Sequence, residues 1–544
     1  MATVGRETGA ADESQDLAAY GYKQELGRVL GFFSNFGVAF SYLSPVVGIY
    51  SLYVLGLGTG GPAYIWTILF VVAGQLLVAL VFAELGSSIP LAGALFQWTR
   101  RLVGNGYGWW TGWFYAWALV ITVASVDTGF VPYIATLINE WFGAHINPTS
   151  PNDILYLTLI LLAIQTTINV VGVRFTGLIA RYGVWVEVLG TFGVFILLGA
   201  FGFHRSPGVL VSSLGVQHAH SNPLGVNFHG SWFPAAAVIA VLANVYIFYG
   251  FESAADVSEE VVHARRHVPR AIVWTMVVGC ITSFVLVAGF DLALPRAGGF
   301  GKTVTGGLPF LFAADLHHQW LVQAVFVVVV LAFFSCGTSV QAAGARVLFS
   351  YSRDRQLPAS RLLSQVTPAF RTPVPAILVC GVVPALFALL ARINPAKPFH
   401  IGFIVYPAHV NALFVLVSFA TSGIYLSFLM TVAGALLARL RGWRPRGFSL
   451  GRLAYPVYAI ALCYQVAVLL DIIFPSGLSS PCGLLFNYDW LTLAVMVLIA
   501  LIGLVVFALY RPAGRVARAV EVGARPAGAG PEVGAASLGA RPGQ

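Results

Sequence analysis

Long apolar stretches dominate the pattern of hydrophobic and polar positions along this chain. Runs such as 62–83 and 154–173 are apolar over about twenty residues, the length with which an α-helix crosses the hydrocarbon core of a bilayer. The strands of a membrane β-barrel would instead alternate apolar and polar residues over about ten positions. Because a segment in lipid must satisfy its own backbone hydrogen bonds, these runs predict membrane-spanning helices.

We expect about twelve such helices in an all-α polytopic membrane protein. The expected spans are 29–54, 63–84, 109–138, 154–173, 182–203, 232–254, 271–294, 319–345, 374–392, 404–437, 454–475 and 489–510. The tenth stretch, taken from 401 to 440, is also long enough for two short spans. The polar tail at 1–28 and the Gly-, Ala-, Pro- and Arg-rich tail at 511–544 lack apolar periodicity, and we expect the second to be disordered.

The positions of the basic residues favour twelve spans over thirteen. If the N-terminus is cytoplasmic, the external loops hold few of the 30 Lys and Arg residues: Arg205, Arg296, Lys302, Arg392 and Lys397. The others then lie on the cytoplasmic side, as the positive-inside rule requires. A thirteenth span would move the Arg-rich loop at 439–452 to the other side. We therefore expect a multi-pass protein of the cell membrane, plasma or inner, with both termini in the cytoplasm.

The composition excludes several classes of function. Hydrophobic residues make up 58% of the chain and charged residues 9%, whereas a soluble domain carries about 25% charged residues. The basic residues behind the net charge of +9 lie in short loops and form no continuous stripe, so no nucleic-acid partner is expected. The five cysteines show no metal-ligand spacing. Gly301-Lys302-Thr303 resembles the end of a phosphate-binding loop, but residue 296 is Arg where that motif requires Gly. We expect no enzymatic activity, no metal and no cofactor.

The first expected span contains an interruption. Its sequence there is Ser41-Tyr42-Leu43-Ser44-Pro45-Val46-Val47-Gly48. Pro45 removes a backbone donor and clashes with the preceding turn, so the helix should break at this point. Ser44 would then cap a second half-helix that has Pro45 at its first position. The free N–H groups and positive dipole end of that half-helix would suit a carboxylate. The alternative interpretation is a simple proline kink.

The sixth expected span carries a second interruption at a corresponding depth. Its residues are Tyr249-Gly250-Phe251-Glu252, a glycine and a carboxylate within an apolar run. Interrupted helices at matching places in two halves are typical of transporters built from inverted repeats, with the substrate site at the membrane midplane. The repeats would be 29–203 and 232–437, and the helices at 454–510 would be additional, so that the transporter domain covers 29–510.

Three blocks of the sequence resemble the amino acid–polyamine–organocation permeases. Residues 83–94 (AELGSSIPLAGA) are similar to the loop after the second helix of that superfamily. Residues 250–255 (GFESAA), followed by Glu259-Glu260 and Pro269-Arg270, resemble its sixth helix and the next loop. Residues 346–358 (RVLFSYSRDRQLP) resemble the stretch after its eighth helix. The blocks are in the right order, and the resemblance covers about 25–510.

The resemblance implies a fold, a function and a branch of the superfamily. It implies five-plus-five inverted repeats with two appended helices, in a secondary transporter that imports amino acids or related amines by alternating access. Ser44-Pro45 and Gly61-Pro62 look most like the amino acid/choline branch, which includes γ-aminobutyrate permeases. Many members carry GxG at the first break where this chain has Ser-Pro-Val-Val-Gly, which limits the transfer of substrate contacts.

Ionisable and hydroxyl residues inside the spans are the candidates for coupling transport to a cation, either H⁺ or Na⁺. Charged groups are costly in the membrane and are therefore functional candidates. They are Asp127 in the third span, Glu187 in the fifth and Glu252 in the sixth; for Glu187 the alternative is a position near the cytoplasmic end of its helix. Ser335, Thr338 and Ser339 supply hydroxyls where related folds hold sodium against the first helix. Close helix packing through small residues is the alternative role for these three.

The remaining expectations concern the substrate and the gates. The candidate substrate-binding residues are Ser41, Tyr42, Ser44, Pro45, Val46, Val47, Gly48, Tyr249, Gly250, Phe251 and Glu252. The candidate gating residues in the cytoplasmic loops are Glu84, Pro90, Gly93, Arg353 and Asp354. The partners expected are a small amino acid or amine and the lipid bilayer. A choline or polyamine carrier, a channel and a nutrient sensor are the alternatives, and the sequence does not indicate an oligomeric state.

Overall fold

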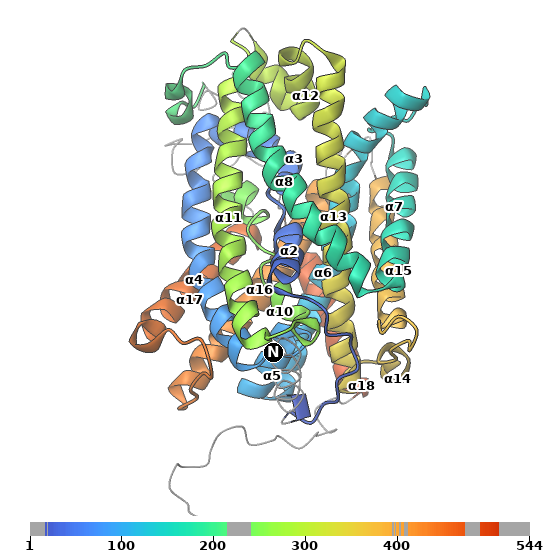
Figure 1. The fold of residues 1–544 in the computed structure, drawn as a ribbon, viewed down its shortest axis with the longest axis vertical. Helices are drawn as coiled ribbons and strands as arrows, with labels where there is room; N and C mark the ends of the chain where they lie inside the picture. Colours follow the sequence, from blue (N-terminus) through green and yellow to red (C-terminus); the bar gives the residue numbers. More distant parts are fainter. Residues whose placement is uncertain are drawn as a thin grey trace, which may run out of the picture.

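The computed structural model describes a bundle of long helices that run mainly along one axis (Figure 1). The described residues are 17–18, 20–214, 241–296, 298–393, 397, 399–401, 404–406, 412–473 and 490–510. The first described residues lie at the end of the bundle that carries the short helix α5 (Ala94–Leu102), and α12 (Gly299–Asp315) lies at the opposite end (Figure 1). The expected C-terminal tail at 511–544 lies outside the described residues.

The other elements follow the expected order of spans. The α-helices are α2 (Phe32–Leu43), α3 (Pro45–Gly60), α4 (Trp66–Ser88), α6 (Asn105–Phe142), α7 (Pro151–Val171), α8 (Val173–Phe201), α10 (Ser253–Asp256), α11 (Ala264–Ala293), α13 (Gln319–Arg353), α14 (Ser360–Leu363), α15 (Val374–Ala388), α16 (Ala412–Leu440), α17 (Ala454–Ile473) and α18 (Leu491–Tyr510). The 3₁₀ turns are η1 (Pro62–Ile65), η2 (Pro207–Val211), η4 (Ser258–Glu260), η5 (Leu389–Arg392) and η6 (Gly451–Leu453).

Length and composition support the all-α polytopic class. In the described part of the chain, ten helices are long and apolar enough to cross a membrane, and α15 is a shorter apolar helix. Apart from the sixth, each expected span coincides with one of these described helices. Most of the first half of the sixth span lies outside the described residues, which resume at 241.

The tenth span is a single helix, as the charge distribution indicated. Its described part runs from Ala412 to Leu440, and earlier in the expected stretch β1 (Phe399–Ile401) and β2 (Ile404–Tyr406) pair as short antiparallel strands. The hairpin pairs Phe399 with Tyr406. The interpretation of this stretch as two spans is therefore wrong.

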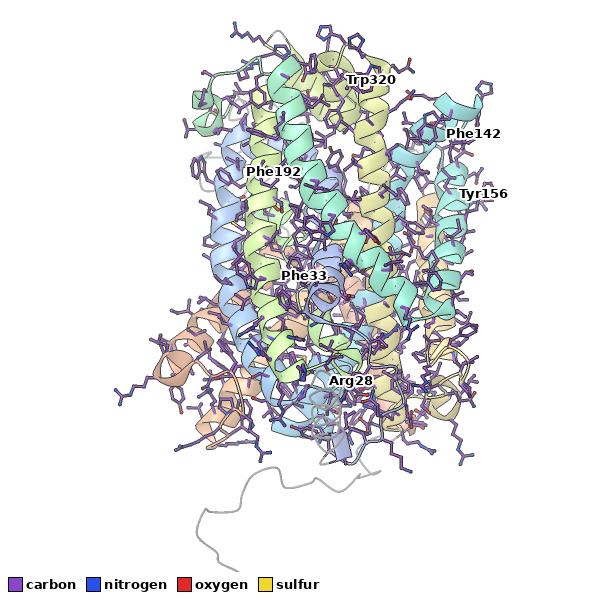
Figure 2. All side chains as sticks on the ribbon, viewed as in Figure 1. Arg28, Phe33, Phe142, Tyr156, Phe192 and Trp320 are labelled. Carbon is purple, nitrogen blue, oxygen red and sulfur yellow. The ribbon has the colours of Figure 1, made fainter. Side chains whose placement is uncertain are left out.

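The interior and exterior of the bundle differ in the expected way for a protein in lipid. The helices α2, α3 and α6 form the interior, with α6 packed against α13 and α16, and α2 against α8. Large apolar side chains project from the outer surface, among them Phe33, Phe192 and Trp320 (Figure 2). A soluble protein rarely exposes a large contiguous apolar surface, so this exterior fits a hydrocarbon environment.

Glu84 joins three helical elements instead of standing free in a loop. It lies on α4, is fully buried, and forms an ion pair with Arg439 of α16. One of its carboxylate oxygens accepts a hydrogen bond from the Tyr458 hydroxyl of α17 at 2.7 Å, and the other accepts from the Leu450 N–H at 2.9 Å. The carboxylate therefore fixes α17 and the loop before it to the rest of the bundle.

We expect Glu84→Ala to lower the stability of the purified protein by about 3–5 kcal/mol, because it leaves the buried Arg439 guanidinium without its counter-ion. A thermal melting curve in detergent measures the effect. The matched control is Glu140→Ala, an exposed glutamate on α6, which should change stability by less than about 0.5 kcal/mol. Equal melting temperatures for the two variants would contradict this role of Glu84.

Candidate functional site

The first helix breaks where the sequence predicts. Helix α2 ends at Leu43, Ser44 adopts a left-handed conformation with φ of 37°, and α3 starts at Pro45. The Ser44 hydroxyl accepts a hydrogen bond from the Val47 N–H at 3.2 Å, so Ser44 is the N-cap of α3 and Pro45 its first residue. A kinked but continuous helix is thereby excluded.

The second interruption is also present. Residues 241–245 are helical, 246–252 are not, and the chain becomes helical again in α10. Gly250 has a φ of 107°, which an L-residue with a side chain rarely adopts. The glycine therefore permits the turn that separates the two parts of this interrupted helix.

The two breaks lie against each other. A Cβ atom on Gly250 would come within 2.7 Å of the Leu43 nitrogen, and one on Gly48 within 2.5 Å of Cγ1 of Ile247. The rings of Tyr42 and Tyr249 meet edge to face with centroids 6.0 Å apart. Two segments that are far apart in sequence thus form one buried centre, in which glycine allows the backbones to approach closely.

Two buried acids lie beside the second break. The Glu252 carboxylate accepts a hydrogen bond from the Gly250 N–H at 2.8 Å. The Tyr115 hydroxyl, from α6, donates to Asp256 at 2.5 Å and lies 3.4 Å from Glu252. All three side chains are buried, and Oδ1 of Asp256 has no partner among the described residues. Tyr115 and Asp256 were not predicted from the sequence, although the four-residue spacing of Glu252 and Asp256 was an available signal.

Aromatic side chains around the breaks have different surroundings. The Tyr42 hydroxyl is buried and has no partner among the described residues. The Tyr249 hydroxyl is 3.4 Å from the Thr122 hydroxyl of α6. The Phe251 ring packs against Phe82 of α4 and Phe428 of α16, with centroids 5.8 and 5.5 Å away. Tyr42 and Tyr249 therefore border the centre, whereas Phe251 fixes the second break to the neighbouring helices.

The alternative that places Glu187 near a helix end was wrong. It sits in the middle of α8, is 1% exposed, and accepts a hydrogen bond from the Ser44 hydroxyl at 2.8 Å. The Val46 N–H contacts the same carboxyl group. Residue spacing within α8 gave no sign of this contact, because it depends on how α8 packs against the first break.

Asp127 and Ser335 of α13 contact different neighbours, α7 in one case and the first helix in the other. Asp127 on α6 accepts a hydrogen bond from the Gln165 amide of α7 at 2.7 Å, and its other oxygen has no partner among the described residues. Ser335 donates to Ser41 at 3.0 Å, and Ser41 in turn donates to the carbonyl of Ala180 at 3.2 Å.

The two other candidate hydroxyls of α13 make fewer contacts between helices. Thr338 donates to the carbonyl of Phe334 in its own helix at 2.8 Å. The buried Ser339 hydroxyl has no partner in the described part of the chain. Of the three candidates, Ser335 alone hydrogen-bonds to a side chain of the first helix among the described residues.

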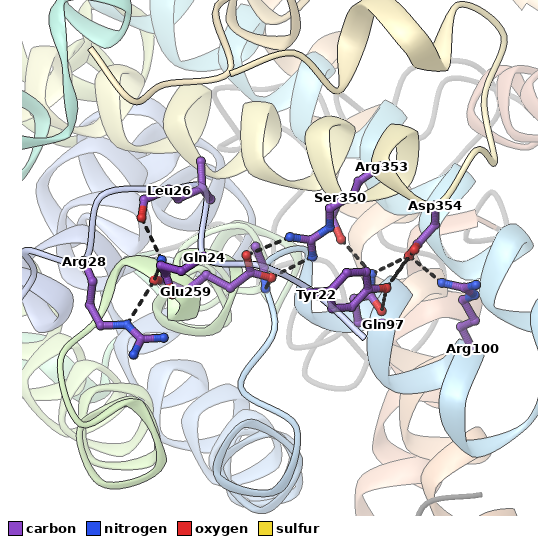
Figure 3. Close-up of polar contacts among 11 residues, drawn as sticks. Tyr22, Gln24, Leu26, Arg28, Gln97, Arg100, Glu259, Ser350, Arg353 and Asp354 are labelled. Atoms are coloured by element: carbon purple, nitrogen blue, oxygen red, sulfur yellow. Dashed lines mark hydrogen bonds and ion pairs between the residues drawn. The ribbon is translucent and has the colours of Figure 1, made fainter. Parts of the chain in front are cut away.

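The N-terminal segment is bound to one end of the bundle by a network of polar contacts (Figure 3). The Tyr22 hydroxyl donates to Asp354 at 2.7 Å, and Asp354 also forms an ion pair with Arg100 of α5. Arg353 binds Glu259 at 2.7 Å and lies over the Tyr22 ring, with its guanidinium carbon 3.9 Å from the ring centroid. Burial raises the pKa of Tyr22 above its ordinary value, so its hydroxyl remains a donor.

The loop before α5 joins the same network. The Ala92 N–H donates to the Glu259 carboxylate at 3.0 Å, and the Gly93 N–H donates to the carbonyl of Asp256 at 3.3 Å. Pro90 lies partly buried in this loop. The structure thus brings together Pro90, Gly93, Arg353 and Asp354 of the candidate gating residues, and it places Glu84 apart from them on α4, next to α16 and α17.

The sequence matches known transport proteins over most of its length. The amino acid permease family matches residues 30–502. The amino-acid permease BAT1 of Arabidopsis thaliana is 25% identical, with 89% of this chain and 92% of that protein aligned. The GABA-specific permease of Saccharomyces cerevisiae is 26% identical, with 86% of this chain and 79% of the yeast protein aligned.

A solved structure supports the fold. The manganese transporter of Eremococcus coleocola superimposes with a TM-score of 0.52 at 14% sequence identity, and the alignment covers 89% of this chain and 94% of that one. At this identity the likeness concerns the fold alone.

We expect Tyr22→Phe to loosen the N-terminal segment without unfolding the bundle. A hydrogen bond to a charged acceptor contributes about 1.5–3 kcal/mol, so amide hydrogen exchange in residues 20–30 should accelerate about ten- to a hundredfold. Exchange followed by mass spectrometry measures this. Tyr156→Phe, at an exposed tyrosine on α7, is the control and should leave exchange in this segment unchanged. Unchanged exchange in the Tyr22 variant would show that the hydroxyl does not fasten the segment.

Proposed function

The chain belongs to the amino acid permease family of the amino acid–polyamine–organocation superfamily, and on this premise we propose that it imports an amino acid or closely related amine by alternating access. Proteins of this family are transporters and not enzymes, and the chain is accordingly a multi-pass membrane protein with a small-molecule substrate.

The observation that carries the proposal is the meeting of the two helix breaks. Leu43 and Gly250 approach closely in the buried interior, where the interrupted first and sixth spans meet. Such a pair offers backbone donors at one break and acceptors at the other, as a zwitterion requires. In our proposal the substrate carboxylate binds at the N-terminus of α3, and the amine binds toward Glu252.

Side chains with unused hydrogen-bonding capacity support this placement. The Tyr42 hydroxyl and Oδ1 of Asp256 are buried without partners in the described part of the chain. Buried polar groups are normally satisfied, and those left over are candidates for binding a ligand or water. A substrate ammonium group would complete the hydrogen bonding of this acidic side of the centre.

The end of the bundle that holds the N-terminus is, in our proposal, the cytoplasmic end in the cell membrane. The basic residues of the loops support this orientation. The contacts of Tyr22, Arg353 and Asp354 would then close the cytoplasmic path and separate when the substrate is released. Uptake against a gradient requires an energy source, for which we propose symport with H⁺ or Na⁺.

A carrier of choline or polyamines is the second candidate. It is favoured by the two buried acids, Glu252 and Asp256, and by the rings of Tyr42 and Tyr249, which could bind a quaternary ammonium group through cation–π contacts. The two candidate functions differ in whether the transported substrate must carry a carboxylate.

Uptake into proteoliposomes tests the proposal. Labelled amino acids, γ-aminobutyrate, choline and putrescine would be supplied, with proton and sodium gradients imposed separately. We expect gradient-dependent accumulation of at least one amino acid. Accumulation of choline or putrescine alone would favour the second candidate, and binding without any accumulation would indicate a sensor.

We expect Glu252→Gln to reduce kcat/KM for uptake at least about tenfold, because the neutral amide loses the charge-assisted contact with the substrate amine. Initial uptake rates against substrate concentration measure this. Glu140→Gln, at the exposed end of α6, is the matched control and should transport normally. If the Glu252 variant kept both its kcat/KM and the pH dependence of the wild type, our assignment of the amine site would be wrong.

A further inference from the structure

The position expected to bind the substrate carboxylate already holds a carboxyl group of the protein. This is Glu187 of α8, at the N-terminus of α3. We propose that Glu187 is a resident carboxylate that the substrate carboxylate displaces, and that it takes up one proton when it is displaced. The inference rests on the function proposed above and extends it, since it identifies H⁺ as the coupling ion and names the group that carries it.

The donors at the start of α3 are in use. Pro45 has no N–H, and the Val46 N–H contacts the Glu187 carboxyl. The Val47 N–H donates to the Ser44 hydroxyl, which itself donates to Glu187 at 2.8 Å. A substrate carboxylate can reach the same donors only if Glu187 moves away. Two carboxylates therefore compete for one helix end.

Only one of the two carboxyl oxygens of Glu187 has a hydrogen-bond partner among the described residues. Its Oε2 accepts the Ser44 hydrogen bond, while Oε1 has no partner among the described residues, and the side chain is 1% exposed. Among the described residues, no Lys, Arg or His forms an ion pair with Glu187. The helix dipole and the Ser44 hydroxyl are therefore its main sources of stabilisation when ionised.

The groups that face Glu187 from neighbouring helices do not offer a second place for its charge. From α13 the titratable neighbour is the buried thiol of Cys336, which also interacts with Asp127 of α6. The first helix contributes Ser44 and Val46, and among the described residues no charged side chain of α7 or α11 forms an ion pair with Glu187. Nearby, Ser335 donates to Ser41, so this hydroxyl pair is already engaged.

Protonation follows from these surroundings. A carboxylate that leaves the helix end for an apolar interior loses its donors, and an unpaired charge there is very unfavourable. Uptake of one proton on Glu187 removes that charge. The substrate carboxylate then supplies the negative charge at the helix end. The substrate-bound protein therefore holds one zwitterion and one proton more than the free protein. Release of the substrate lets Glu187 return to α3 and lose its proton.

The coupling has a sign that can be measured. Because binding takes up a proton, affinity for a carboxylate-bearing substrate should rise about tenfold for each unit by which the pH falls, over the range in which free Glu187 is ionised. A ligand that has the amine but lacks the carboxylate should not displace Glu187. Its affinity should be independent of pH over the same range.

Calorimetric titration of the purified full-length protein tests the proposal. The probes are γ-aminobutyrate and its neutral amide, 4-aminobutanamide, and proton uptake is counted by repeating each titration in buffers of different ionisation enthalpy. The wild type should take up about one proton per γ-aminobutyrate and none per amide. Glu187→Gln should bind γ-aminobutyrate with no proton uptake, and in proteoliposomes it should exchange substrate without accumulating it under a pH gradient.

Two comparisons make the result decisive. If Glu187→Gln still takes up a proton when it binds γ-aminobutyrate, the inference is wrong. If Asp127→Asn then abolishes that proton uptake, the proton belongs to Asp127 instead. If Glu187→Gln does not fold, the wild type alone decides: equal proton uptake with γ-aminobutyrate and with its amide would overturn the inference. If the wild type binds neither γ-aminobutyrate nor any amino acid of the uptake panel, the proposed function itself fails.

Discussion

The architecture depends on the requirement that every backbone polar group within a membrane find a partner inside the protein. Continuous helices meet that requirement by themselves, whereas an interrupted helix does not. At the first break the Val47 N–H donates to the Ser44 hydroxyl, and that hydroxyl in turn donates to Glu187 of α8. The second interruption is satisfied in part by Glu252, which accepts the Gly250 N–H. Each break is therefore tied to a carboxylate, and these carboxylates are what give the centre its chemistry.

Local features of the sequence were sufficient to locate both breaks. Proline after serine determines a helix end from covalent geometry alone, and Gly250 beside a carboxylate in an apolar run marks the second interruption. The order and approximate limits of the spans also followed from the lengths of apolar runs and from the distribution of Lys and Arg. The hairpin that precedes α16 was missed because short, mainly apolar strands are not distinguished from the start of a helix by periodicity.

The partners of the acids could not be predicted in the same way. Glu187 reaches Ser44, and Tyr115 reaches Asp256, through the rotation and depth at which neighbouring helices pack. Those quantities depend on side-chain interdigitation over whole helices and leave no mark in the spacing of one helix. The same limit applies to Glu84. It was grouped with the loop that follows it in sequence, yet its contacts are with Arg439 and Tyr458, far along the chain.

The contact between Gly250 and Leu43 has a consequence for how this protein can diversify. At that contact there is no space for even a methyl group, so the backbone frame around the centre is fixed in shape. Variation in ligand preference must then come from side chains that line the centre but do not determine its backbone shape, such as the rings of Tyr42 and Tyr249. A lineage that retains the glycine can exchange these rings and acquire new ligand preferences, while a lineage that loses it must rebuild the whole junction. The geometry thus separates positions open to adaptation from a position closed to it.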